Sequence, residues 1–358
     1  MVSVKCLTAY CTININSELN IFCRTGDRKN IMNLWKKRNR KMILTGNKNI
    51  ISLFCWIFFL FYTDKLISGT FGQLKGYTDI VLFRDTFIAV GTDGRIDRIS
   101  NSGEIVSVDR SNAYRLNCAF SNDGIVLAAG NHGTILHSSD GRLFNRAESR
   151  TDKNIYGITS KNGMILAGTE RGIILNSKDG KSWGSTQTEA KGHVLSLSAN
   201  HSFFIGVTDS GEILKSFDGI HWDIQDYNKA YAGYNVLSIF KKIVVTPHTI
   251  VIIGTHDDGS PSILFSSLGT VWAERLPVYY DDEGRISYLT NNLNDITFDS
   301  DRNQFILACD NGEVFSLPNC TKCNKLLKLS GSDLNVIIYI DHRILFAGED
   351  YSVFIQRL

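Results

Sequence analysis

A short motif recurs at a fixed interval and restricts this chain to a repeat architecture. The motif reads Ser-x-Asp-Gly-x-x-Trp or Phe, and its aspartates are residues 140, 179 and 218, so both intervals are 39 residues. An altered copy occupies residues 266–272, where Leu268 replaces the aspartate. A motif with a period near 40 residues is typical of proteins built from similar, adjoining units. The repeats therefore predict a fold, and they say little by themselves about function.

After residue 70 the sequence consists of short apolar segments separated by Gly, Asn and Asp, which is typical of an all-β protein. Aligned on the motif, residues 69–358 form seven units of about 41 residues, the size of a four-stranded blade. The chain is predicted to be a seven-bladed β-propeller, with six or eight blades as alternatives. The last unit ends after three strands, so we expect residues 69–74 to add a fourth. Pairing the N- and C-terminal strands in this way would close the ring and protect its edges. Residues 281–292 are expected to form a loop.

The residue types of the motif suit a turn between the third and fourth strands of a unit. Asp accepts hydrogen bonds from nearby backbone N–H groups, Gly adopts positive φ without steric cost, and the aromatic ring would pack against the unit. The motif residues are Ser138, Asp140, Gly141, Phe144, Ser177, Asp179, Gly180, Trp183, Ser216, Asp218, Gly219 and Trp222. They resemble the Asp-box (BNR) repeat of sialidase-like propellers and of propellers similar to the photosystem II stability and assembly factor. The resemblance implies a propeller with structural turns, and a fold does not define a function.

The first 68 residues differ in composition from the rest. Residues 1–41 carry nine Lys or Arg and two acidic residues, a net charge of +7, and are expected to be a disordered extension. Residues 42–68 contain the apolar run Ile50–Tyr62, which is short for a bilayer span of about 20 residues but suits a signal peptide. A retained membrane anchor and a buried core helix are the alternatives. A signal peptide or an anchor would place residues 69–358 outside the cytoplasm.

Charge and motifs exclude several classes of partner. The whole chain has a formal charge of +2, so residues 42–358 carry −5. A mildly acidic body lacks the clustered cationic face that nucleic acid requires. No cofactor is predicted, since no Gly-rich phosphate loop precedes a helix. No metal is predicted either, because His256-Asp257-Asp258 has no second cluster at ligand spacing.

The loops between second and third strands are expected to share one face with the loops that join the blades. Loops on a rigid scaffold commonly bind partners, so we expect a protein or glycan ligand on this central face. The alternative is that these polar loops are only solvated. The candidate binding residues are Asp93, Tyr114, Arg115, His132, Glu170, Arg171, Asp209 and Asp257.

Cys320 and Cys323 have CxxC spacing. A zinc site normally needs a second pair, and a redox motif normally opens a helix in a βαβ unit. In an exported protein, a small disulfide in the sixth unit is the preferred interpretation.

Sialidase activity is the most specific enzymatic alternative. The resemblance to sialidase-like proteins would imply an Arg-Ile-Pro motif, and none of the four prolines is preceded by Arg-Ile. The sequence therefore predicts a non-catalytic, monomeric propeller outside the cytoplasm that binds a protein or glycan. The alternative is a sialidase-like glycoside hydrolase with atypical catalytic residues.

Overall fold

The structure is a computed structural model, and it describes residues 2–6, 9–16, 18–23, 75–230, 237–281, 283–318, 322–329 and 332–357. The chain forms two compact units, Met1–Thr70 and Phe71–Leu358.

The first unit contains a three-stranded antiparallel sheet. Its strands are β1 (Val2–Cys6), β2 (Ala9–Asn16) and β3 (Glu18–Cys23), in that order. The sequence predicted a disordered extension over residues 1–41, and the structure differs in these three segments. Residues 12–16 read Thr-Ile-Asn-Ile-Asn, which has the polar and apolar alternation of a strand.

The predicted signal peptide or anchor, residues 42–68, lies outside the described residues and stays a prediction. In the part of the chain that the structure describes, no helix has both the length and the apolar character needed to cross a bilayer.

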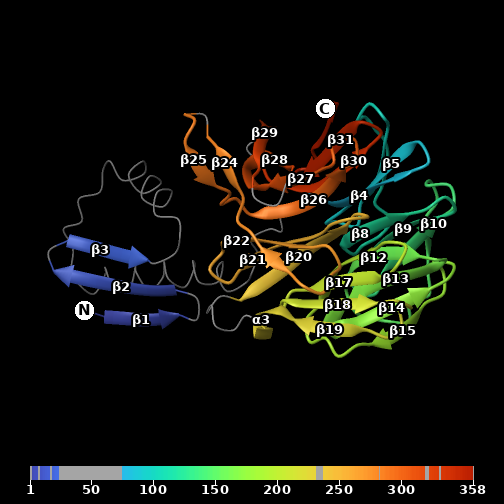
Figure 1. Ribbon diagram of the computed structural model, residues 1–358, viewed down its shortest axis with the longest axis horizontal. Coiled ribbons are helices and arrows are strands. Elements are labelled where there is room, and N and C mark those ends of the chain that lie inside the picture. The colour runs from blue at the N-terminus through green and yellow to red at the C-terminus, as the bar shows by residue number, and fades with distance from the viewer. Residues whose placement is uncertain are drawn as a thin grey trace, which may run out of the picture. The chain divides into compact units, whose positions relative to one another are not determined.

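Seven antiparallel sheets follow one another along the second unit, and we number them blades 1 to 7 in chain order (Figure 1). Blade 1 contains β4 (Tyr77–Phe83), β5 (Thr86–Gly91), β6 (Ile96–Ile99) and β7 (Ile105–Asp109). Blade 2 contains β8 (Leu116–Ser121), β9 (Val126–Gly130), β10 (Ile135–Ser138) and β11 (Asn145–Arg146). Blade 3 contains β12 (Ile155–Lys161), β13 (Met164–Thr169), β14 (Ile173–Ser177) and β15 (Gly184–Gln187). Blade 4 contains β16 (Val194–Ala199), β17 (Phe204–Thr208), β18 (Glu212–Ser216) and β19 (Asp223–Asp226).

The last three blades are less regular. Blade 5 contains β20 (Ser238–Val245), β21 (Ile250–His256), β22 (Pro261–Ser266) and β23 (Ala273–Glu274). Blade 6 contains β26 (Leu293–Asp299), β27 (Gln304–Cys309), β28 (Glu313–Leu317) and β29 (Asn324–Lys328). Blade 7 contains β30 (Leu334–Ile340), β31 (Arg343–Gly348) and β32 (Val353–Arg357). Among the described residues, the helical elements are η1 (Glu170–Gly172), α3 (Tyr227–Ala230) and η3 (Asp310–Gly312). The prediction of a seven-bladed propeller is confirmed.

Apolar side chains from each pair of adjoining blades form the core. The second strand of a blade is buried on both faces, as in the sequence Val-Leu-Ala-Ala-Gly of β9. Burial on both faces requires a continuous apolar run rather than alternation. Seven hydrophobic clusters result, each made by two neighbouring blades, and the seventh joins blade 7 to blade 1 through residues such as Tyr77 and Leu345.

The first strand of every blade lies at the centre of the ring beside the first strands of its two neighbours. Each of these seven inner strands carries a β-bulge near its start. The bulged residue lies one residue after the start of the strand in six of the blades and three residues after it in blade 5. At five interfaces the bulged side chain donates a hydrogen bond to a backbone carbonyl of the next inner strand. The donors are Thr78, Asn117, Lys241, Asn294 and Asn335. These bonds satisfy carbonyl groups that the inner sheet edge leaves unpaired.

The ring closes where blade 7 meets blade 1, and the strands of the two blades lie side by side in Figure 1. Gly76 forms a β-bridge with Glu349, and the backbone N–H of Asp350 donates to the carbonyl oxygen of Lys75 at 2.7 Å. Residues 69–74, the predicted fourth strand of blade 7, lie outside the described residues, so that strand stays a prediction.

Residues 281–292 were expected to form a loop, and this expectation is wrong in part. β24 (Val278–Tyr280) and β25 (Ile286–Tyr288) form a hairpin that precedes blade 6. Tyr279 packs against Phe315 of blade 6, with 5.2 Å between ring centroids. The hairpin contributes only three residues per strand, which is too short for a sequence pattern to identify.

Candidate functional site

The repeated motif lies at the turn between the third and fourth strands, as predicted. In blade 3 the Asp179 carboxylate accepts hydrogen bonds from the backbone N–H groups of Lys181 (2.8 Å) and Ser182 (3.0 Å). The backbone N–H of Gly180 donates to Ser177 Oγ at 2.9 Å, and Trp183 Nε1 donates to the Gly180 carbonyl at 3.1 Å. Backbone donors stabilise the ionised carboxylate and lower the pKa of Asp179.

The other copies form the same turn. The Asp140 carboxylate accepts from the backbone N–H groups of Arg142 and Leu143, which lowers the pKa of Asp140 to about 2. In the third copy, the side chain and backbone N–H of His221 and the backbone N–H of Ile220 lower the pKa of Asp218. In the altered copy the backbone N–H of Gly269 still donates to Ser266 Oγ, at 2.8 Å. The serine and glycine therefore form the turn even where Leu268 replaces the aspartate.

The motif glycines also contact the preceding blade. A Cβ atom at Gly141 would lie 3.1 Å from Phe83 Cδ1, and one at Gly180 would lie 3.0 Å from Leu127 Cδ2. Both glycines have φ near +70°, a conformation that favours glycine. These turns hold one blade against the next.

The predicted acidic residues of the central face accept hydrogen bonds from other segments of the propeller. Asp209 accepts from the backbone N–H of His193 at 2.7 Å, Glu170 from that of Asn154 at 3.2 Å, and Asp257 from that of Leu237 at 3.2 Å. Asp93 accepts from the hydroxyl of Tyr351. Three of the carboxylates therefore fasten the start of a blade, and Asp93 links blade 1 to blade 7, which makes these four residues weaker candidates for ligand contact.

The remaining predicted residues form an aromatic and cationic surface on blades 2 and 3. The rings of Tyr114 and His132 lie 4.7 Å apart, and both side chains are exposed. Arg115 is half-buried beside them; burial lowers the pKa of its guanidinium, and its Nε donates to Asn117 at 2.9 Å. Arg171 is exposed in blade 3.

Tyr156 extends this surface and was missed in the sequence. It stacks on His193 with 6.0 Å between ring centroids, and it occupies the bulge of β12. The corresponding bulged residues in blades 2 and 6 are the asparagines Asn117 and Asn294. An aromatic residue at a position that five of the seven blades use for blade-to-blade hydrogen bonds was the available signal. We call Tyr114, Arg115, His132, Tyr156, Arg171 and His193 the aromatic surface.

A charged cluster lies among the inner strands, at the residue after the bulge. Lys242 Nζ is 3.2 Å from the carboxylate of Asp295. Burial lowers the pKa of Lys242, but the Asp295 and Asp79 carboxylates outweigh that effect and raise the pKa overall. Burial raises the pKa of Asp79, which Lys242 and the backbone N–H of Ala119 oppose in part. Asp79 and Asp295 also accept from backbone N–H groups of the next blade, Ala119 (2.9 Å) and Ile337 (3.0 Å). These acceptors are already occupied, so the cluster stabilises the ring.

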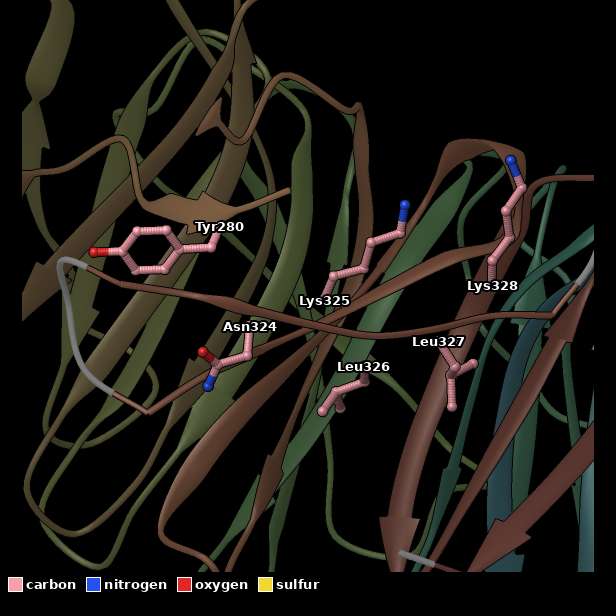
Figure 2. A pocket seen from close by; sticks show the side chains of 6 residues that line it. All are labelled: Tyr280, Asn324, Lys325, Leu326, Leu327 and Lys328. Atoms are coloured by element: carbon pink, nitrogen blue, oxygen red, sulfur yellow. The ribbon is translucent and has the colours of Figure 1, made fainter. Parts of the chain in front are cut away.

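An open cavity of about 370 Å³ lies between β24 and β29. Figure 2 shows Lys325 and Lys328 on the same side of β29, away from Leu326 and Leu327, with Tyr280 across the cavity. Glu313 is 3.0 Å from Lys325 Nζ and 3.8 Å from Lys328 Nζ. Both lysines are therefore engaged by the same carboxylate, and neither cation of this cavity is left without an ion-pair partner.

Cys323 is a buried free thiol whose Sγ donates to the carbonyl of Val278 at 3.7 Å, and burial raises its pKa to about 11. Cys320 lies outside the described residues, so the predicted disulfide is not seen and stays a prediction. Over the described ranges, no group of three or more His, Cys, Asp or Glu side chains is placed to hold a metal ion.

No protein-family model matches the chain, and no curated protein matches its sequence. Comparison with solved structures defines the class, which is that of the β-propellers. The chain is similar to YCF48 from Cyanidioschyzon merolae, with a TM-score of 0.57 and 14% identity over 79% of this chain and 95% of that one. It is similar to a structure of YCF48 bound to D1 peptide, with a TM-score of 0.58 and 17% identity over 79% and 93%. It is also similar to the computationally designed Ika8 protein, with a TM-score of 0.54 and 11% identity over 80% and 98%.

Proposed function

We propose that this protein is a non-catalytic scaffold that binds a protein partner through the aromatic surface. The observation that carries the proposal is the close pairing of Tyr114 with His132 and of Tyr156 with His193, beside Arg115 and Arg171. Tyrosine and arginine are the residue types enriched where binding energy concentrates in protein interfaces. Their rings lose little conformational entropy on binding.

The scaffold beneath this surface supports the proposal. The loops that carry it are fastened by hydrogen bonds such as His132 N–H to Asn154 Oδ1 (3.0 Å) and Arg171 N–H to His193 Nδ1 (3.2 Å). Loops held in this way bind without a large ordering cost. A similar propeller, YCF48, has a solved structure with D1 peptide, and we propose that an extended peptide segment is the form of ligand here as well.

The absence of catalysis is part of the proposal. Of the carboxylates on the central face, Glu170, Asp209 and Asp257 each accept a hydrogen bond from a backbone N–H at the start of a blade, and Asp93 accepts one from the hydroxyl of Tyr351. Glycoside hydrolysis needs two opposed carboxylates that are free to exchange protons or attack. The alternative is a sialidase-like glycoside hydrolase with atypical catalytic residues, and hydrolysis of an aryl sialoside panel by the purified chain would establish it.

We further propose that the three motif turns are Asp-box repeats, and that the propeller is monomeric and works outside the cytoplasm. Support for the location is the apolar run Ile50–Tyr62 behind a basic segment. Cell fractionation of the full chain, with N-terminal sequencing of the recovered protein, tests location and cleavage together. Light scattering on a sizing column tests the monomer.

The binding test uses the full chain on arrays of extended peptides that are acidic, neutral or basic, and on a glycan array. We expect acidic peptides with aromatic residues to bind. Tyr114→Ala with His132→Ala should weaken that binding at least tenfold. Tyr280→Ala removes an exposed tyrosine elsewhere and serves as the control. Equal peptide binding by the double variant and the wild type would contradict the proposal, and selective glycan binding would assign a glycan ligand instead.

A further inference from the structure

The face that carries the motif turns contains a second cavity, between blades 1 and 2. Its volume is about 220 Å³, several times the roughly 30 Å³ that a water molecule occupies in the liquid. One wall is the β4–β5 hairpin of blade 1, with Arg84 and Asp85. The opposite wall is the motif turn of blade 2, with Asp140 and Arg142, and Arg98 of β6 also lines the space.

Three guanidinium groups therefore line one small cavity. Arg84 is held in place because its guanidinium donates to the carbonyl of Ser139 at 2.9 Å and lies over the Phe83 ring. Among the described residues, Arg84, Arg98 and Arg142 form no ion pair. Guanidinium groups are charged at every physiological pH. With Asp85 and Asp140 counted, the cavity keeps a net charge of +1.

Arg98 is the unusual member. Its Nε is buried and has no hydrogen-bond partner in the structure. A buried donor without a partner costs about 1–3 kcal/mol, and more when the group is charged. The cost falls when a ligand supplies the missing acceptor.

The corresponding residues of other blades meet this need within the protein. Arg98 pairs with Ile88 across its sheet, as Lys215 pairs with Ile205 in blade 4. Lys215 Nζ donates to the carbonyl of Leu268 at 2.7 Å and lies over the Phe203 ring. Asn176 of blade 3 bonds with Thr186. Blade 1 has the larger cation at this position and no protein acceptor for its Nε.

We infer that the cavity between blades 1 and 2 binds a small tetrahedral oxyanion, a phosphate or sulfate group on a soluble ligand, with Arg98 as its central contact. The Arg98 fork donates two parallel hydrogen bonds, which matches the oxygen geometry of phosphate or sulfate. Arg84 and Arg142 close the cavity from either wall. Asp140 stays bonded to its own turn, and Asp85 limits the affinity by repulsion.

The test titrates the full chain with inorganic phosphate, sulfate and acetate at constant ionic strength, using calorimetry and thermal melting. We expect one binding site for phosphate or sulfate and at least tenfold weaker binding of acetate. The anion that binds more tightly identifies which of the two groups the ligand carries. Arg98→Gln should weaken anion binding at least tenfold, and Arg98→Lys should retain part of it. Asp85→Asn should tighten it a few-fold, because it removes a repelling charge.

The matched control is Arg146→Gln, which removes an exposed arginine from β11 without touching the cavity. Unchanged affinity in Arg98→Gln, or an equal loss in Arg146→Gln, would overturn the inference. If Arg98→Gln fails to fold, Arg142→Gln carries the test, because Arg142 is exposed and its backbone N–H stays in the turn. A loss of about threefold or more is then expected, and unchanged binding would again overturn the inference.

Discussion

Asn335 Nδ2 donates a hydrogen bond to the carbonyl oxygen of Tyr77 at 3.2 Å, joining residues that are 258 positions apart. Asn117 makes the same bond to Ile155 between blades 2 and 3, at 2.9 Å. The junction of the first and last blades thus repeats the hydrogen bond of an ordinary interface.

This equivalence predicts the cost of breaking the junction. Asn335→Ala leaves the inner-edge carbonyl of Tyr77 without its partner, so we expect the free energy of unfolding to fall by about 1–3 kcal/mol. Asn117→Ala is the matched control within the chain and should cost a similar amount. Urea denaturation measures both. A cost for Asn117→Ala with none for Asn335→Ala would show that the junction is held by other contacts.

Lys242→Met leaves Asp79 and Asp295 without their cation. We expect a loss of about 2–3 kcal/mol at pH 7, below the usual cost of breaking a fully buried pair because Lys242 is partly exposed. The neighbouring Lys241→Met removes one hydrogen bond to a carbonyl and should cost about 1 kcal/mol.

The loss in Lys242→Met should depend on pH. Removing Lys242 takes away the charge that lowers the pKa of Asp79, so that pKa rises further above its unfolded value. The folded state then binds a proton that the unfolded state releases, and stability increases as the pH falls from 7 toward about 4. If the difference in unfolding free energy between Lys242→Met and the wild type were constant over this pH range, the placement of Asp79 beside Lys242 would be contradicted.

Acidification should weaken the wild-type propeller through the motif turns. The pKa values of Asp140, Asp179 and Asp218 lie below the unfolded value of about 3.9 because backbone or side-chain donors stabilise each carboxylate. Their contribution is present above about pH 4 and is lost as the pH falls toward 2. The triple variant Asp140→Asn, Asp179→Asn and Asp218→Asn should melt lower at pH 7 and lose less on acidification. This prediction would be contradicted if the melting temperatures of the wild type and the triple variant fell in parallel from pH 7 to 2.5.

Two glycines with the same backbone conformation separate turn strain from blade contact. Gly180 (φ +71°) would place a Cβ 3.0 Å from Leu127, whereas Gly163 (φ +76°) has nothing within 4 Å. Gly163→Ala should cost about 1 kcal/mol for its positive φ. Gly180→Ala should cost about 1–3 kcal/mol more, because the packed side chains of Leu127 and Ile125 in the neighbouring blade must shift to make room. Equal costs by urea denaturation would mean that the motif turn does not hold the blades together.

Local patterns in the sequence determined the blades and their turns. The 39-residue interval and the Asp-Gly turn predict the repeat because both act between residues close in the chain. The predicted binding surface stays a prediction. The structure brings Tyr114 and His132 together, whereas Asp209 and Glu170 accept hydrogen bonds from the backbone at the start of a blade. A carboxylate in a loop looks the same in sequence whether it meets a ligand or a backbone N–H.

The tertiary structure alone decided what lies between blades. The bond from Asn335 to Tyr77, the contact of Lys242 with Asp295 and the cavity around Arg98 each join residues from different blades or turns. The packing of one blade against the next brings these residues together, and no periodicity records such a contact. The sequence by itself therefore determined a propeller with Asp-Gly turns, and the closed ring decided which of its charged side chains are paired and which are left for a ligand.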